Sequence, residues 1–190
     1  EFGASGGVSI LASGKTISVG DSGFISNYLT LSNIIQLGIA SINLELSGSA
    51  VVSLENCTFR GELNISAPGI LTKSGIYYGN TTLNRTGSAT NFHSYGNNLF
   101  AGNLTVNNSG SAGRIRFAST AADSYFGNAT FNSTGGQDVQ IAYSGNNIFK
   151  GNITINSNKV VFNTSDGKIS FTDTLDQILN GSYNFALANM

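Results

Sequence analysis

The sequence predicts an all-β solenoid, in which each turn of the chain is a repeat stacked on the one before. The stretch Phe100–Asn107 (FAGNLTVN) returns as Tyr125–Asn132 (YFGNATFN) and as Phe149–Asn156 (FKGNITIN). Two further copies begin at Tyr77 and Phe59, so successive repeats start 18, 23, 25 and 24 residues apart. Self-similarity at such a period is typical of stacked repeat architectures.

Each copy alternates apolar and polar residues as a β-strand with one buried face does. Leu104 and Val106 alternate with Thr105 and Asn107, and successive side chains of a strand point to opposite faces. A second apolar strand follows in each repeat, as at Arg114–Phe117 (RIRF). We therefore expect two strands per repeat, joined by turns rich in glycine and asparagine.

Other repeat architectures fit this pattern less well. A leucine-rich repeat has a similar period, but its leucine pattern is missing, and a propeller blade needs roughly 40 residues or more. One repeat per coil of a parallel β-helix, with 18 to 25 residues per coil, fits best. The aromatic first positions of the repeats should then form a column inside the solenoid: Phe59, Tyr77, Phe100, Tyr125 and Phe149.

The Gly-Asn-x-Thr-x-Asn run and the phrase Leu11–Gly20 (LASGKTISVG) resemble known proteins. They are similar to the right-handed parallel β-helix superfamily of pectin-lyase-like enzymes, bacterial passenger domains, phage tailspikes and some ice-binding proteins. More narrowly, they resemble repeat segments of large secreted bacterial surface proteins and adhesins. The resemblance covers residues 59–162 and implies a right-handed solenoid from a bacterial protein that is secreted or on the cell surface.

The continuous repeat indicates a single β-solenoid domain over residues 1–190. We divide it into irregular N-terminal coils (1–58), regular repeats (59–162) and a C-terminal coil or cap (163–190). Terminal solenoid units close off the core, and Ile34, Ile35 and Ile39 are the residues expected to do so at the N-terminal end.

Composition argues against several classes of partner. Charged residues make up 10% of the chain and its net charge is −1, so it lacks the clustered cations that neutralise nucleic-acid phosphates. No apolar run reaches the 18 residues of a membrane-spanning helix. The lone Cys57 is expected in the core, because unpaired cysteine is among the most buried residue types.

Few residues could support catalysis. Glycosidases need two carboxyl groups within about 5 to 10 Å, and Asp173 and Asp176 are the one close acidic pair in the C-terminal region. The only histidine, His93, aligns with Ala118 and has no serine or aspartate constellation beside it. We therefore predict that the chain is not an enzyme and needs no metal or cofactor, with a polysaccharide-degrading β-helix enzyme as the more distant alternative.

Stacking the repeats places polar residues in outward columns with rows about 4.8 Å apart. Threonine favours strands and asparagine ladders bond along a stack, so a structural role explains these columns. Planar amides and hydroxyls also suit sugar hydroxyls or ice, and both interpretations stay open. The candidate surface-binding columns are Asn80, Asn103, Asn128 and Asn152, and Thr82, Thr105, Thr130 and Thr154, with Asn84, Asn107, Asn132 and Asn156 beside them.

These observations predict a structural and adhesive module of an exported bacterial cell-surface protein. It would act as a stiff spacer whose outward face makes many weak contacts. The alternative is a polysaccharide- or ice-binding module that uses the same asparagine and threonine columns. Expected partners are surface glycans or other cell-surface ligands, and further copies of the chain, because solenoid ends expose unpaired strand edges.

Overall fold

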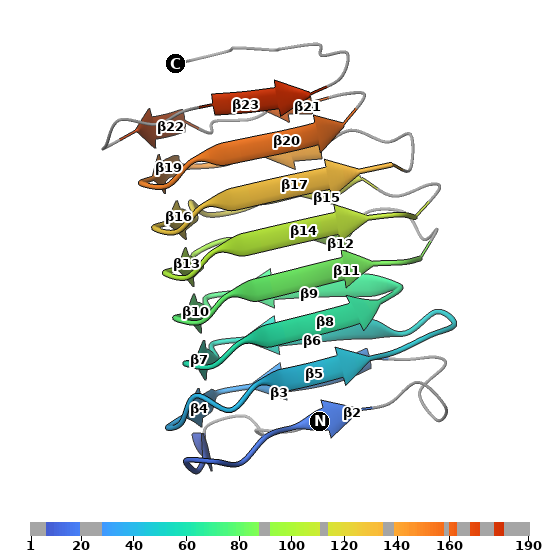
Figure 1. The fold of residues 1–190 in the computed structure, drawn as a ribbon, viewed down its shortest axis with the longest axis vertical. Coiled ribbons are helices and arrows are strands. Elements are labelled where there is room, and N and C mark those ends of the chain that lie inside the picture. The colour runs from blue at the N-terminus through green and yellow to red at the C-terminus, as the bar shows by residue number, and fades with distance from the viewer. Residues whose placement is uncertain are drawn as a thin grey trace.

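The chain is a parallel β-solenoid (Figure 1), which confirms the predicted all-β fold class. The computed structural model describes residues 7–19, 28–87, 92–110, 114–134, 139–157, 160–162, 168–171 and 177–180. Within these residues there is no helix, and each strand pairs in parallel with its counterpart one coil away.

Three faces run along the solenoid. The described part of the short-strand sheet holds eight strands: β1 (Ser9–Leu11), β4 (Ile34–Gln36), β7 (Thr58–Phe59), β10 (Ile76–Tyr77), β13 (Leu99–Phe100), β16 (Ser124–Tyr125), β19 (Asn146–Phe149) and β22 (Lys168–Phe171). The long-strand sheet is formed by β2 (Ser18–Val19), β5 (Ile42–Glu45), β8 (Leu63–Ala67), β11 (Thr81–Arg85), β14 (Leu104–Asn108), β17 (Ala129–Ser133), β20 (Ile153–Ser157) and β23 (Gln177–Asn180).

The third face changes from one sheet to another along the solenoid. Its N-terminal part is formed by β3 (Tyr28–Ser32), β6 (Val51–Glu55) and β9 (Gly69–Lys73). Its C-terminal part is formed by β12 (Phe92–His93), β15 (Ile115–Arg116), β18 (Val139–Ile141) and β21 (Val160–Phe162). A single parallel bridge between Lys73 and Gly96 joins the two parts.

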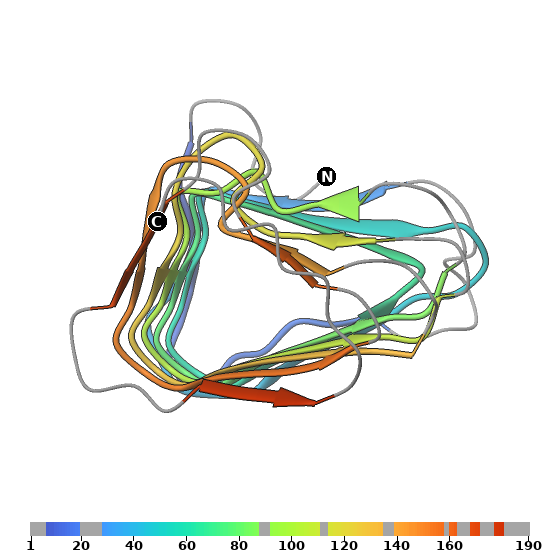
Figure 2. The same cartoon turned by 90° about the horizontal axis from the view of Figure 1, so that it is seen from above.

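Seen along its axis, the solenoid has a roughly triangular cross-section (Figure 2). Each coil passes from the short-strand sheet to the long-strand sheet and then to the third face. In this view, the chain turns counter-clockwise as it rises toward the C-terminal end. The solenoid is therefore right-handed, as crossovers between parallel strands almost always are.

The prediction of two strands per repeat is wrong, because each coil has three. The repeated stretch does not lie on one strand: Phe100 ends β13, and Leu104 begins β14 on the next face. Glycine makes the corner between them, since coils approach closely there. A Cβ atom on Gly102 would lie 2.4 Å from the carbonyl oxygen of Gly79, and one on Gly127 would lie 2.5 Å from that of Gly102.

Two further expectations differ from the structure. Ile34 and Ile35 belong to β4, which pairs with both β1 and β7 and so does not close the end of the core. The corner after β4 is longer than in the five coils that follow, and Ile39 in it is 82% exposed. His93 pairs with Arg116, not with Ala118, because the next repeat is two residues longer after this strand: Phe100 follows His93 by 7 residues, whereas Tyr125 follows Arg116 by 9.

The core contains the predicted column of aromatic side chains. Phe59, Tyr77, Phe100, Tyr125 and Phe149 are all buried. The rings from Tyr77 onward are stacked, with centroids separated by 4.9, 5.4 and 4.4 Å. This confirms the predicted internal column, which lies against the apolar side chains of the long-strand sheet.

Cys57 lies in the same core. It is 1% exposed, as expected, and its Sγ is 3.2 Å from the Leu31 carbonyl oxygen. Burial raises the pKa of the Cys57 thiol, so it stays protonated at neutral pH and packs as a small apolar residue.

The aromatic column should contribute strongly to stability. Replacing Phe100 with alanine removes a ring that stacks on both neighbours, so we expect a loss of about 3 to 5 kcal/mol in the free energy of unfolding. Phe126→Ala is the matched control, because Phe126 is 44% exposed. Urea unfolding of the two variants tests this, and equal stabilities would contradict the assignment of the column to the core.

Candidate surface-binding columns

The threonine column lies in exact register on the long-strand sheet. Thr82 pairs with Thr105, Thr105 with Thr130, and Thr130 with Thr154. All four side chains are half-buried and point away from the core, while the residues on either side of them are buried. The column therefore presents one hydroxyl and one methyl group per coil, and adjacent coils are about 4.8 Å apart.

The first asparagine column stands at the corner before these strands. The Asn80 Oδ1 atom accepts a hydrogen bond from the Asn103 backbone N–H at 3.2 Å. Asn103 and Asn128 accept in the same way from the N–H groups of Asn128 and Asn152, both at 2.9 Å. Each amide oxygen thus fixes the corner of the next coil. We call this set (Asn80, Asn103, Asn128 and Asn152) the corner asparagine row.

The second asparagine column is a side-chain ladder. The Asn107 Nδ2 group donates to Asn84 Oδ1 at 2.7 Å, and Asn132 Nδ2 donates to Asn107 Oδ1 at 2.7 Å. Asn156 Nδ2 continues the ladder to Asn132 Oδ1 at 2.6 Å. Bonds in which identical amides join along a stack are typical of cross-β ladders, so this column stabilises register between coils.

A third ladder, which the sequence reasoning missed, runs inside the solenoid. Asn98, Asp123 and Asn147 occupy equivalent places two residues before the buried ring of their coil. Asn98 Oδ1 accepts from the Gly75 N–H at 3.0 Å, Asp123 Oδ1 from the Asn98 N–H at 2.9 Å, and Asn147 Oδ1 from the Asp123 N–H at 2.8 Å. The repeated sequence Gly-Asn-Asn-x-Phe at 96–100 and 145–149 was the available signal for it.

Asp123 is the one carboxyl group in this inner ladder. It is fully buried, and its Oδ1 atom also accepts from Asn98 Nδ2 at 2.9 Å, while Tyr125 donates its hydroxyl to Oδ2 at 3.3 Å. Loss of hydration raises the pKa of Asp123 to about 6, although these hydrogen bonds oppose the rise. The neighbouring phenols of Tyr77 and Tyr125 have raised pKa values, mainly because they are buried as well.

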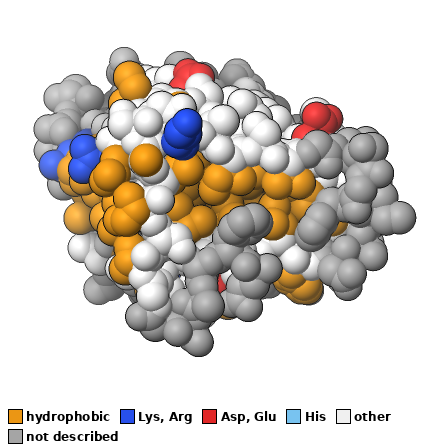
Figure 3. Space-filling view, turned by 90° about the horizontal axis from the view of Figure 1, so that it is seen from below, with side chains coloured by type: hydrophobic (Ala, Val, Ile, Leu, Met, Phe, Trp, Pro, Cys, Tyr) orange, Lys and Arg blue, Asp and Glu red, His pale blue; other side chains and the backbone are white. Residues whose placement is uncertain are grey.

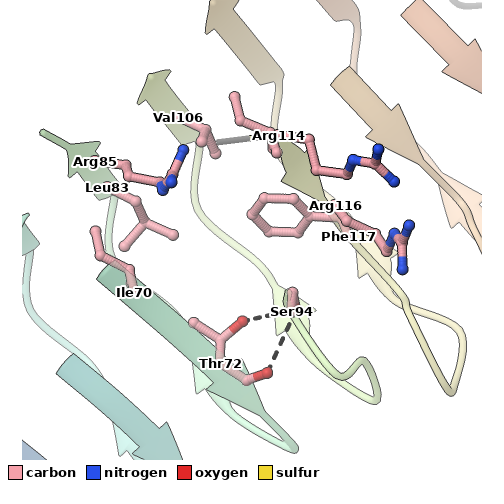
Figure 4. A pocket seen from close by; sticks show the side chains of 10 residues that line it. Ile70, Thr72, Leu83, Arg85, Ser94, Val106, Arg114, Arg116 and Phe117 are labelled. Carbon is pink, nitrogen blue, oxygen red and sulfur yellow. Dashed lines mark hydrogen bonds between the residues drawn. The ribbon is translucent and has the colours of Figure 1, made fainter. Parts of the chain in front are cut away.

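A small cavity lies where the third face changes from β9 to β12 (Figure 4). Its volume is about 30 Å³, which is enough for about one water molecule. Thr72 and Ser94 hydrogen bond across it at 2.8 Å, and apolar side chains such as Leu83, Val106 and Phe117 form much of its wall. Its size fits a packing gap at the sheet junction and not a ligand site.

The described residues bring together no catalytic pair that the sequence suggested. Asp173 and Asp176 lie outside them, so the prediction that this pair is not catalytic stays a prediction. Among the residues that the structure describes, no group of three or more histidine, cysteine, aspartate or glutamate side chains is placed to hold a metal ion. The same part of the chain contains no helix long and apolar enough to cross a membrane.

Comparisons with known proteins give no family for the chain. No protein-family model matches it, and neither the curated proteins nor the solved structures give a significant match. The class of protein therefore comes from the coordinates alone: a parallel β-solenoid repeat protein with three polar ladders and an apolar, aromatic core.

The inner ladder should make stability depend on pH. The folded-state pKa of Asp123 is about 6 against an ordinary value of 3.8, so the unfolded chain binds fewer protons between these values. With respect to this group, the folded state is therefore most stable below about pH 4. Its free energy of unfolding should fall by about 3 kcal/mol as the pH rises through 6.

Asp123→Asn should remove this dependence and be more stable than the wild type at pH 7, because its amide oxygen can still accept from Asn98. Urea unfolding of both proteins at pH 4 and pH 7.5 measures the effect. If the free energy of unfolding of the variant differs between the two pH values as much as that of the wild type, Asp123 does not cause the pH dependence.

Proposed function

We propose that this chain is a structural and adhesive module of an exported bacterial cell-surface protein. One observation carries the proposal: strands on the short-strand and long-strand faces stack without interruption, from β1 to β22 and from β2 to β23. Such a stack resists bending, because each coil is bonded to its neighbours by backbone hydrogen bonds and by side-chain ladders. It therefore suits a stiff spacer.

The outward face of the long-strand sheet is the proposed contact surface. Its central residues are uncharged threonine and asparagine side chains at constant spacing. A flat array of this kind offers many equal, weak polar contacts and no charge selectivity, which suits attachment to surface glycans or other cell-surface ligands. The resemblance to bacterial surface proteins and the single, buried cysteine favour a secreted or cell-surface location.

The N-terminal end of the described part of the solenoid supplies a second kind of contact. Figure 3 views the N-terminal end, where hydrophobic side chains form a band between polar rims. Val8, Ile10 and Tyr28 near this end are 62%, 59% and 62% exposed. Exposed strand edges and apolar surface favour association with another copy of the chain. We therefore include self-association in the proposed function.

The alternative is a polysaccharide- or ice-binding module that uses the same columns: Asn80, Thr82, Asn103, Thr105, Asn128, Thr130, Asn152 and Thr154. The exact register of the threonines favours it, because a regular target needs regularly spaced groups. The corner asparagines count against it in part, since their amide oxygens already bond the next coil.

An adhesion assay with charged variants tests the proposal. Thr130→Lys places a long cation in the centre of the contact surface, so beads coated with this variant should detach severalfold more easily from bacterial and animal cells. Thr120→Lys is the matched control, because Thr120 is an exposed threonine that follows β15 of the third face.

Two other outcomes separate the candidates. Equal detachment of both variants and the wild type would contradict a contact role for the long-strand sheet. Loss of binding to immobilised polysaccharide or to ice crystals in Thr130→Lys, with adhesion to cells unchanged, would favour the alternative.

A further inference from the structure

A line of exposed side chains runs along the corner between the short-strand and long-strand sheets. In each coil, the residue after the buried ring points outward. The backbone N–H groups of Tyr78, Ala101, Phe126 and Lys150 all donate to the coil before them at 2.8 Å, so these residues hold equivalent positions. With Arg60 in the same place one coil earlier, they form what we call the corner ridge: Arg60, Tyr78, Ala101, Phe126 and Lys150.

The corner ridge exposes two aromatic rings on either side of a small residue. Tyr78 is 53% exposed and Phe126 is 44% exposed, whereas the rings one residue earlier in the chain are buried. Ala101 lies between them, so the two ring positions are two coils, or about 10 Å, apart. Ala101 and Gly102 are half-exposed, so only small residues lie between the two ring positions.

Polar groups of fixed orientation stand beside the two rings. Asn80, Asn103 and Asn128 of the corner asparagine row follow Tyr78, Ala101 and Phe126 by two residues. Their amide oxygens are held by backbone N–H groups of the next coil, which orients each amide. The exposed Asn80, Asn103 and Asn128 side chains can then offer Nδ2 donors to a ligand at the corner.

Charge is confined to the ends of the ridge. Arg60 lies at one end, with Glu62 two residues on, and Lys150 lies at the other, where its Nζ atom is 4.1 Å from the centre of the Phe126 ring. The stretch between Tyr78 and Phe126 therefore has apolar rings and neutral amides. This combination suits a ligand with an apolar face, a polar edge and no charge.

We propose that the surface over Ala101, between Tyr78 and Phe126, binds a pyranose unit of a neutral polysaccharide whose chain lies along the corner ridge. The apolar faces of the sugar pack against Tyr78 and Phe126, and its hydroxyl groups accept hydrogen bonds from the corner asparagine row. A linear polymer suits the site because the ridge repeats its spacing from coil to coil. This site is separate from the threonine column, although it shares the corner asparagine row with the alternative function above. It does not depend on the adhesive role proposed there.

Affinity gel electrophoresis with laminarin, galactomannan and xylan tests the inference, with each polysaccharide cast separately in the gel. At least one of them should retard the wild-type chain. Tyr78→Ala and Phe126→Ala should each weaken the retardation about tenfold, since a lost ring contact is worth about one factor of ten. Ala101→Leu should do the same by filling the space between the two ring positions.

Tyr95→Ala is the matched control, because Tyr95 is 42% exposed and lies between β12 and β13, away from the corner. Its retardation should equal that of the wild type, and thermal unfolding should show that all four variants are folded. Absence of retardation by all three polysaccharides, or equal retardation of ridge and control variants, would overturn the inference. Light scattering adds one more contradicting outcome: loss of self-association in the ridge variants without any retardation would assign the ridge to a second copy.

Discussion

The close approach of successive coils at the glycine corner is the constraint on which the rest of the structure depends. At Gly79, Gly102, Gly127 and Gly151, a Cβ atom would lie within 2.5 Å of the carbonyl oxygen one coil earlier. Only glycine allows this approach, because every other residue would push the coils apart. With the corner fixed, the aromatic ring that precedes the glycine in the chain stacks on the ring of the preceding coil. The strand that follows the glycine pairs in register with the strand of the preceding coil.

Three polar ladders then keep the coils from slipping, and each acts on a different part of the coil. The corner asparagine row bonds backbone to side chain, the outer ladder bonds amide to amide, and the inner ladder satisfies backbone groups that are out of reach of water. Buried polar groups that are fully bonded specify one register, since slipping a coil would leave them unsatisfied. Asp123 occupies the same position in its coil as the asparagines of the inner ladder, but it carries a carboxyl group. This group makes the inner ladder sensitive to pH.

The same ladders decide which side chains remain for function. Asparagines whose oxygens are already engaged have less freedom to meet a ligand than their exposure suggests, although their Nδ2 groups still face solvent. The threonines of the long-strand sheet and the rings of the corner ridge take no part in these ladders. Surface roles should therefore concentrate in these two places, one flat and polar and the other stepped and aromatic.

Much of the architecture could be predicted from the sequence, because the repeat and its period-two alternation fix both the stacking and the buried face. Phe100 and Leu104 show the limit of this reasoning. They are close in the chain and both buried, so the pattern merges them into one strand, although the glycine between them turns the chain onto another face. Tyr78 and Phe126 show a second limit: they follow buried rings directly, and hydrophobicity alone does not tell the outward ring from the inward one. Asp123 was missed because its role depends on Asn98 and Asn147, which only stacking brings next to it.

The central claim is that equivalent residues of adjacent coils lie directly over one another. A disulfide tests it most directly, because the bond requires Cα atoms about 4.4 to 6.8 Å apart. Thr105→Cys combined with Thr130→Cys should oxidise readily to an intramolecular disulfide, since these residues pair on adjacent strands. Thr105→Cys combined with Thr154→Cys should not, because the pair is two coils, or about 10 Å, apart. Free thiols in the first double variant, or a disulfide in the second, would contradict the account.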